Sequence, residues 1–265
     1  MHYIWKEWKE NIRGKGLWLS LSIIVLISLS IMFRSPILSF DKGFYVLLIN
    51  LFETVIYFIP ILCLFIGAFS IFQEKEQKTL IMLLTKTDSY PGFLLKKSLG
   101  LYSVVIIPLI AWFFIYLLLL KFYFPVDFSS YLIFLLSLIC LALIFLQMGA
   151  AIGSFSRSRM QMIGFSVFIW FYFFFLHEFI LLSLLPDVTY GNVQWFSILY
   201  FLNPLEAVRM FLETGMGVFS FGHMSRLLQS FMWTKPGYFL AASFVFWMAV
   251  SFGTAIVFHH KEGNE

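Results

Sequence analysis

The stretch SLGLYSVVIIPLIAWFFIYLLLL, residues 98–120, contains no charged side chain and decides the class of fold. It is 23 residues long, and an α-helix needs about 20 apolar residues to cross roughly 30 Å of hydrocarbon. Strands of a membrane barrel would be runs of about 10 residues with alternating polarity. We therefore expect a membrane-spanning helix here.

Five further stretches have the same character. Glu53 interrupts the second span, and His177 and Glu178 lie in the fifth, whereas the other spans carry no charge. Arg34-Ser35-Pro36 follows the first span where a signal peptide would have small residues. The sequence predicts an all-α integral membrane protein, one transmembrane domain over residues 1–265, with six spans at 16–33, 44–72, 98–120, 128–156, 160–186 and 237–258.

The composition excludes a soluble enzyme. Hydrophobic residues make up 61% of the chain and charged residues only 12%, against about 25% charged in soluble domains. The net charge of +4 does not indicate a nucleic-acid partner, because its distribution follows the spans. Cys63 and Cys140 both lie in apolar runs and form no metal motif, so we interpret them as packing residues.

The distribution of Lys and Arg predicts the orientation. Twelve of them lie in the N-terminal segment, the loops after spans two and four, and the tail, whereas six lie on the other side. Cytoplasmic loops carry the excess of positive charge. We expect a multi-pass protein of the cell membrane with both termini in the cytoplasm.

Three segments outside the spans are informative. Residues 1–15 place Ile4, Trp5, Trp8 and Ile12 on one face of a helix, which predicts an amphipathic helix in the bilayer interface. The cytoplasmic loop 73–97 runs from charged residues into a short apolar helix at 80–84. That pattern suits docking of another protein, or a solvated loop resting on the bilayer.

The segment 187–236 is expected to form a small folded cap on the outer side. Its apolar run at 193–203 is too short to cross the membrane and predicts an interfacial or re-entrant helix. Asn203 and Pro204 then begin a second helix, with Glu206 in its first turn. Its predicted apolar face consists of Leu205, Val208, Phe211 and Leu212.

The pattern Glu-x-Glu-x-x-Thr-Leu-x-x-Leu-Leu at 74–84, with the six spans and the N-terminal helix, resembles the permease subunit of ABC-2 type transporters, a type V exporter-like fold. The resemblance implies two paired permeases and a coupling helix that docks a separate ATPase. Arg157 and Arg159 would line a second contact with that ATPase. The implied coupling residues on the helix are Glu74, Glu76, Thr79, Leu80, Leu83 and Leu84.

A finer resemblance rests on Ser-Arg-Ser-Arg at 156–159 and Leu-Asn-Pro-Leu-Glu at 202–206. Together these are similar to the permease of the nitrous-oxide-reductase maturation transporter, which serves copper-enzyme assembly. The chain departs from the family pattern at Lys78 and at 85–90. The resemblance implies an extracytoplasmic accessory protein, which would meet Asn203, Pro204, Glu206 and Arg209.

The chain has no Gly-x-x-x-x-Gly-Lys-Ser/Thr motif and therefore no phosphate cradle of that kind. We expect no cofactor in this chain and no enzymatic activity. ATP and Mg²⁺ would be bound by the partner ATPase. The predicted partners are that ATPase, a second permease copy, the lipid bilayer and the accessory protein.

Ionisable residues inside a membrane are costly and indicate function by default. Glu53, His177 and Glu178 are predicted at similar depths. They either line a cavity or translocation path, or form a buried hydrogen-bonded set between helices. A zinc protease is excluded because position 181 is Leu where the motif needs His. Direct copper binding by Met210, Met216, Met224, Met232 and His223 is a weaker hypothesis, because Met is also a common packing residue.

Other functions stay open. The chain could move an extracytoplasmic partner without bulk transport, or act as a carrier that needs no ATP. Many carriers contain matched broken helices in two halves, and Pro60 and Pro108 are not such a pair. The small residues at 149–153 allow close helix packing, within one subunit or between two. A membrane enzyme is the third alternative, and no pair of catalytic residues supports it.

Overall fold

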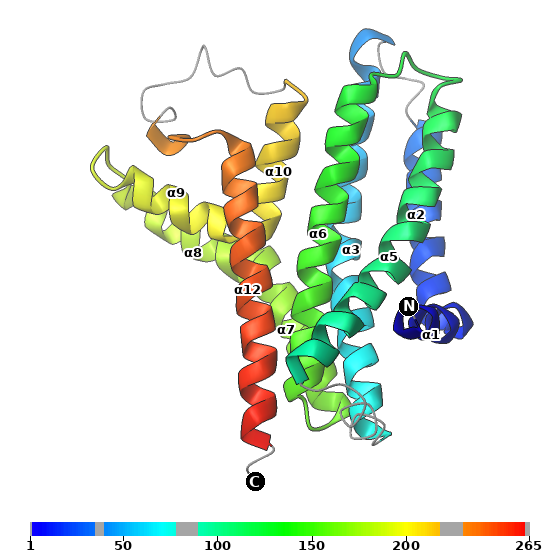
Figure 1. Cartoon of the computed structure of the whole chain (residues 1–265). Helices are drawn as coiled ribbons and strands as arrows, with labels where there is room; N and C mark the ends of the chain where they lie inside the picture. Colours follow the sequence, from blue (N-terminus) through cyan, green and yellow to red (C-terminus); the bar gives the residue numbers. More distant parts are fainter. Residues whose placement is uncertain (1, 35–39, 78–89, 218–229, 263–265) are drawn as a thin grey trace.

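The computed structural model describes residues 2–34, 40–77, 90–217 and 230–262, and every element in these ranges is a helix. Six helices are long and apolar enough to cross a membrane, which confirms the predicted fold class. Most of them stand side by side, and α1 lies across the foot of α2 (Figure 1). The candidate spans are Gly16–Phe33, Gly43–Glu76, Tyr90–Leu120, Phe128–Phe155, Arg159–Asp187 and Pro236–Phe258.

The helices α3 (Phe40–Glu76) and α6 (Phe128–Phe155) form the centre of the bundle. Glycines allow their backbones to touch: a Cβ added to Gly149 would lie 2.4 Å from the carbonyl oxygen of Leu64. An added Cβ on Gly67 or Gly153 would meet the opposite backbone at the same distance. The small residues at 149–153 therefore serve packing within this subunit, one of the two alternatives left open by the sequence.

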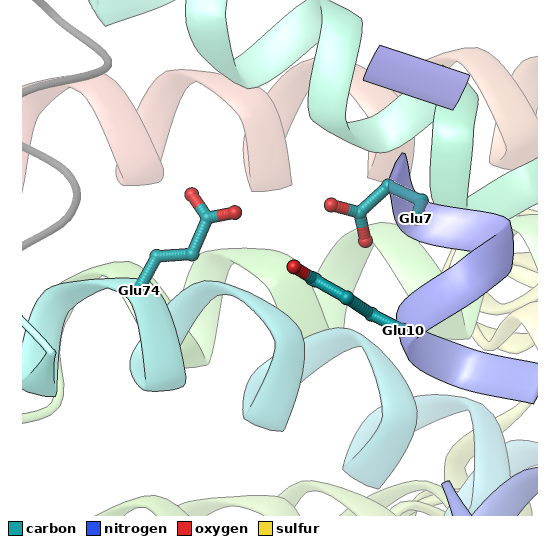
Figure 2. Close-up of side chains that lie close together, drawn as sticks. All are labelled: Glu7, Glu10 and Glu74. Carbon is teal, nitrogen blue, oxygen red and sulfur yellow. The ribbon is translucent and has the colours of Figure 1, made fainter. Parts of the chain in front are cut away.

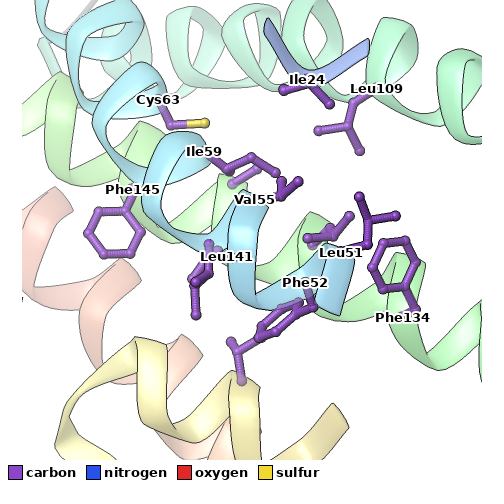
Figure 3. Close-up of a cluster of buried hydrophobic side chains, with 14 of the residues drawn as sticks. Ile24, Leu51, Phe52, Val55, Ile59, Cys63, Leu109, Phe134, Leu141 and Phe145 are labelled. Carbon is purple, nitrogen blue, oxygen red and sulfur yellow. The ribbon is translucent and has the colours of Figure 1, made fainter. Parts of the chain in front are cut away.

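Apolar side chains fill the space around this contact. Val55 and Ile59 of α3 and Leu141 and Phe145 of α6 belong to one cluster, and all four are nearly inaccessible. Figure 3 shows this cluster, to which α2 (Lys15–Arg34) and α5 (Tyr90–Leu120) add Ile24 and Leu109. The described interior of one subunit is thus an apolar core between these helices.

The N-terminal helix α1 (His2–Arg13) is amphipathic as predicted. Unlike an amphipathic helix of a soluble protein, it turns large apolar side chains away from the bundle and a charged one toward it. Trp5 and Ile12 are exposed, whereas the side chain of Glu7 is buried against the bundle. An interfacial helix turns its apolar face to lipid, so its polar face is the one left to contact the protein. α1 therefore contacts the bundle through the buried carboxylate of Glu7 and through Trp8, whose indole N–H donates to Ser103 Oγ of α5 at 3.1 Å.

Two helices extend beyond the spans that hydropathy predicts. The charges at 73–76 lie inside α3 and those at 96–97 inside α5, because a helix continues past the hydrocarbon where its polar side chains find partners. The connection expected at 73–97 is therefore shorter. The remaining predicted coupling residues, Thr79, Leu80, Leu83 and Leu84, lie outside the described residues.

Span five is a composite helix. It consists of α7 (Arg159–Phe171), a π-helical turn (Tyr172–Leu176), α8 (His177–Leu184) and a 3₁₀ turn (Leu185–Asp187). The chain then turns back through α9 (Val193–Leu202) and α10 (Pro204–Gly215), before α12 (Pro236–Glu262). Both α9 and α10 are too short to cross a bilayer, as predicted.

Candidate functional sites at the two ends of the bundle

One end of the bundle carries Lys75, Lys97, Arg157 and Arg159, and we call it the basic end. Lys97 of α5 is buried there between two carboxylates. Its Nζ donates to Glu7 Oε1 of α1 at 2.5 Å and to Glu74 Oε1 of α3 at 2.7 Å. Ser70 Oγ donates to the second oxygen of Glu7 at 3.3 Å. One ammonium group thus joins three helices.

A third carboxylate lies beside this triad. Figure 2 shows Glu7, Glu10 and Glu74 converging from α1 and α3, with their candidate ligand atoms within 4.8 Å of one another. Burial raises the pKa of Glu7, Lys97 lowers it, and the charges of Glu74 and Glu10 raise it further. The spacing would suit a metal ion, but the Lys97 ammonium already supplies a cation between two of the three carboxylates.

The last turn of α3 also contacts the turn between α6 and α7. Lys75 Nζ donates to the carbonyl oxygens of Ser154 at 3.1 Å and Ser156 at 3.3 Å, at the end of α6. Lys75 thereby satisfies carbonyl groups that the helix end leaves without intrahelical partners. Ser158 then caps α7 by accepting a hydrogen bond from the backbone N–H of Gln161.

Glu76 and Arg159 form a two-pronged ion pair at the same place. Arg159 Nε donates to Glu76 Oε1 at 3.0 Å, and its NH2 group donates to Oε2 at 2.8 Å. Both side chains are well exposed, so the pair adds little stability. Its forked geometry nevertheless fixes the orientation of the two side chains relative to each other. Arg157 is exposed beside this ion pair, and its backbone N–H donates a hydrogen bond to Gln161 Oε1.

Of the predicted coupling residues, the structure brings Glu74, Glu76, Arg157 and Arg159 to one end of the bundle. Sequence reasoning missed Lys97 and Glu7, which complete the connection from α3 to α1 and α5. A signal was present, since Lys97 stands directly before an uncharged span and an ionisable residue at that depth needs a partner. Its partner Glu7 is 90 positions away.

The other end of the bundle contains a second shared cation, and we call Glu53, Glu206 and Arg209 the arginine cluster. Arg209 Nε donates to Glu53 Oε1 at 2.9 Å, and NH1 donates to Glu206 Oε1 at 2.8 Å. Tyr200 OH donates to the other oxygen of Glu206 at 2.5 Å. Burial alone would lower the pKa of Arg209, but Glu206 and Glu53 hold it above the usual range.

His177 belongs to a different network from Glu53. Asn203 Nδ2 donates to Phe173 O at 2.9 Å and lies 3.2 Å from His177 Nδ1, whereas His177 Nε2 faces Leu199 O at 3.1 Å. An amide donor at Nδ1 and a carbonyl at Nε2 fit the neutral imidazole protonated at Nε2. This network anchors the α9–α10 connection to the π-turn of span five.

The residues expected to meet an accessory protein lie mostly inside the chain. Asn203, Pro204 and Glu206 are buried, and Arg209 is only partly accessible. Asn203 caps α10 by accepting from the backbone N–H of Leu205 at 3.0 Å, as its position before Pro predicts. These side chains therefore make contacts within the chain itself, and their role toward an accessory protein stays a prediction.

The described methionines of the copper hypothesis lie in two apolar clusters. Met216 packs in the main apolar core and Met232 in a second cluster with Phe201 and Phe239. Met210 is half-buried. His223 and Met224 lie outside the described residues. Met210 packs against the same cluster as Met232, whereas Met216 lies in the other one, and packing accounts for the burial of all three.

These features together define a multi-pass helical membrane protein with a polar joint at one end and a folded cap at the other. The chain belongs to the ABC-2 transporter family: the family model described as "ABC-2 family transporter protein" matches residues 1–263. No curated protein sequence matches the chain. Family membership makes it the membrane component of an ABC transporter, and an ATPase is the implied partner.

Proposed function

We propose that this chain is the permease subunit that couples ATP hydrolysis by a separate ATPase to export, or to a conformational change, across the cell membrane. The basic end would face the cytoplasm, with both termini inside, as its excess of Lys and Arg suggests. ATP and Mg²⁺ would bind to the ATPase and not to this chain.

One observation carries the coupling proposal. The last turn of α3 contacts α1 and α5 through Lys97, the end of α6 through Lys75, and the start of α7 through Glu76. The segment that follows α3 is the one whose residues resemble the ATPase-docking element. A force applied there would therefore reach four other helices through polar contacts of defined geometry.

A second copy of the chain is part of the proposal. The described interior of one subunit is filled by apolar side chains between α3 and α6. A polar cargo cannot cross such a core without large desolvation costs. A route between two permease copies avoids this barrier, so we infer a homodimer.

The finer assignment to nitrous-oxide-reductase or other copper-enzyme maturation rests on the motifs at 156–159 and 202–206. In that role the transporter would drive an extracytoplasmic accessory protein. The genes adjacent to the coding sequence test this assignment. A neighbouring cluster of copper-enzyme genes would support the assignment. A neighbouring ATPase gene without such a cluster would leave only the general transporter function.

The central experiment is purification of the tagged chain from its own cells in mild detergent, followed by identification of the co-purifying proteins. We expect a stoichiometric ATP-binding-cassette protein that is lost in Leu83→Asp. Leu185→Asp is the matched control, because it adds the same charge at an exposed position of the other end. A folded chain that retains no ATPase would contradict the proposal and favour a carrier.

A separate variant tests transmission through the basic end. Arg159→Ala removes the forked contact with Glu76 but leaves the 80–84 segment unchanged. We expect the ATPase still to co-purify through the 80–84 segment, while stimulation of its hydrolysis by the permease falls about tenfold, roughly the effect of one charge-assisted contact. Normal stimulation in Arg159→Ala would show that force does not pass through this ion pair.

A further inference from the structure

A cavity of about 480 Å³ opens beside the arginine cluster, between α8, α9 and α10. Its walls are apolar and partly aromatic, with Leu181, Leu182, Phe196 and Phe231 among them. The side chains of Glu178, Tyr200, Glu206 and Arg209 form its polar part. The volume lies in the range of small-molecule sites, which are largely apolar with a few polar groups that fix orientation.

The polar part of the cavity has an excess of negative charge. Among the described residues that line the cavity, Arg209 is the one guanidinium, and both Glu53 and Glu206 already bind it. Glu178 adds another carboxylate, and no described residue donates a hydrogen bond to it. Glu213 lies within range of the same charges, since burial, Glu53 and Glu206 raise its pKa and Arg209 lowers it.

The excess limits the chemistry of any occupant. An anion would meet the carboxylates of Glu178 and Glu206, with Glu53 behind them, against the one guanidinium of Arg209, and a neutral molecule would leave Glu178 without a counter-ion. A cation satisfies Glu178 directly. Aromatic rings at the wall add attraction for a cation through their electron-rich faces. The apolar walls in turn require an occupant with a hydrophobic body.

We propose that this cavity binds an amphipathic organic cation, with Glu178 as its counter-ion and the walls from α8 and α9 around its apolar part. The arginine cluster holds the other two carboxylates in place and leaves Glu178 available. This inference deepens the proposed function by naming the class of cargo. It makes no use of the basic end.

Two ions of the same shape and opposite charge provide the test. The full chain is placed in nanodiscs of zwitterionic lipid without ATPase, and binding of tetraphenylphosphonium and tetraphenylborate is measured by equilibrium dialysis against empty nanodiscs. We expect saturable binding of the cation above the lipid background and none of the anion. Equal binding of both ions, or no saturable binding of either, would overturn the proposal.

Variants then locate the site. Glu178→Gln should weaken tetraphenylphosphonium binding about tenfold, the effect of one charge-assisted contact. Asp187→Asn removes the same charge from an exposed position of the same end that does not line the cavity, and should change binding less than twofold. Equal losses in both variants would reduce the effect to surface charge and overturn the assignment of Glu178.

Leu182→Trp provides an independent variant if Glu178→Gln does not fold. Leu182 lines the cavity, but its side chain is 62% exposed, so a larger residue fits without disturbing the core. We expect it to change the affinity for the cation at least fivefold, because the ring takes up space in the cavity and adds an aromatic face to its wall. Unchanged binding in a folded Leu182→Trp would exclude this cavity as the site. Because no ATPase is present, either failure leaves the coupling proposal standing.

Discussion

The two ends of the bundle both contain a cation shared between carboxylates, but they differ in how exposed that cation is. Each contains one cation shared by two carboxylates from different helices. At the basic end the cation is Lys97, whose side chain is 1% exposed. At the other end it is Arg209, whose side chain is 22% exposed beside a cavity.

The difference teaches which kind of ion cluster suits which role. We call the Lys97 triad sealed because its side chains are at most 5% exposed, although Glu74 also lines a cavity with Glu10 and Ser70. The geometry of the triad fixes α1, α3 and α5 together. The arginine cluster is open, and the neighbouring Glu178 remains available to a ligand. Both ends contain similar ion pairs. What distinguishes the proposed binding site from the structural joint is its access to solvent and the additional carboxylate of Glu178.

Breaking the sealed triad should have the largest effect on stability. Lys97→Met would remove the ammonium group that Glu7 and Glu74 share. Removing one partner of a buried ion pair typically costs about 3–5 kcal/mol. We expect the apparent midpoint of thermal unfolding in detergent to fall by several degrees, and α1 to become accessible to protease.

Lys96→Met is the matched control, because Lys96 is the adjacent residue and its side chain is exposed. It changes the net charge equally and should move the midpoint by less than about one degree, as expected of exposed positions. Equal shifts in the two variants would mean that Lys97 acts through net charge and not through the triad.

Breaking the open cluster should have a smaller effect. Arg209→Leu removes the cation from Glu53 and Glu206, but water from the cavity reaches what remains. We expect a loss of about 1–3 kcal/mol, below the cost of a fully buried pair. Thermal unfolding measures it, with exposed Lys235→Met as the control. A loss as large as that of Lys97→Met would remove the distinction between the two ends.

The six spans were predictable from the sequence because long apolar runs of this length are stable in the hydrocarbon of a bilayer. The sequence also predicted the start of α10, since Asn before Pro is a local signal that needs no tertiary information. The shared cations were not predictable in the same way. Glu53 and Arg209 are 156 positions apart, and nothing local indicates their pairing.

The inward face of α1 shows a second limit. In a soluble protein, Trp5 and Ile12 would mark the side that packs on the core. In a membrane the apolar side has lipid available, so periodicity identifies the helix but not the face that meets the protein. The same ambiguity applies to Glu178, which the sequence places in a span without showing the cavity beside it.

The smallest expected effect concerns the pH dependence of the sealed triad. The pKa of Glu7 is raised in the folded chain from its usual value of 4.5, chiefly by burial. Native Glu7 thus keeps its proton to higher pH than unfolded Glu7. Its contribution to stability is complete below about pH 4.5 and is lost as the pH rises through the folded-state pKa.

Glu7→Gln removes this titration while preserving size and hydrogen-bonding capacity. Relative to wild type, the variant should therefore gain stability as the pH rises from 4.5 upward, so the difference between their unfolding midpoints narrows or reverses. Midpoints measured in steps from pH 4 to pH 9 follow the change. A constant difference across that range would show that Lys97 fully compensates the burial of Glu7.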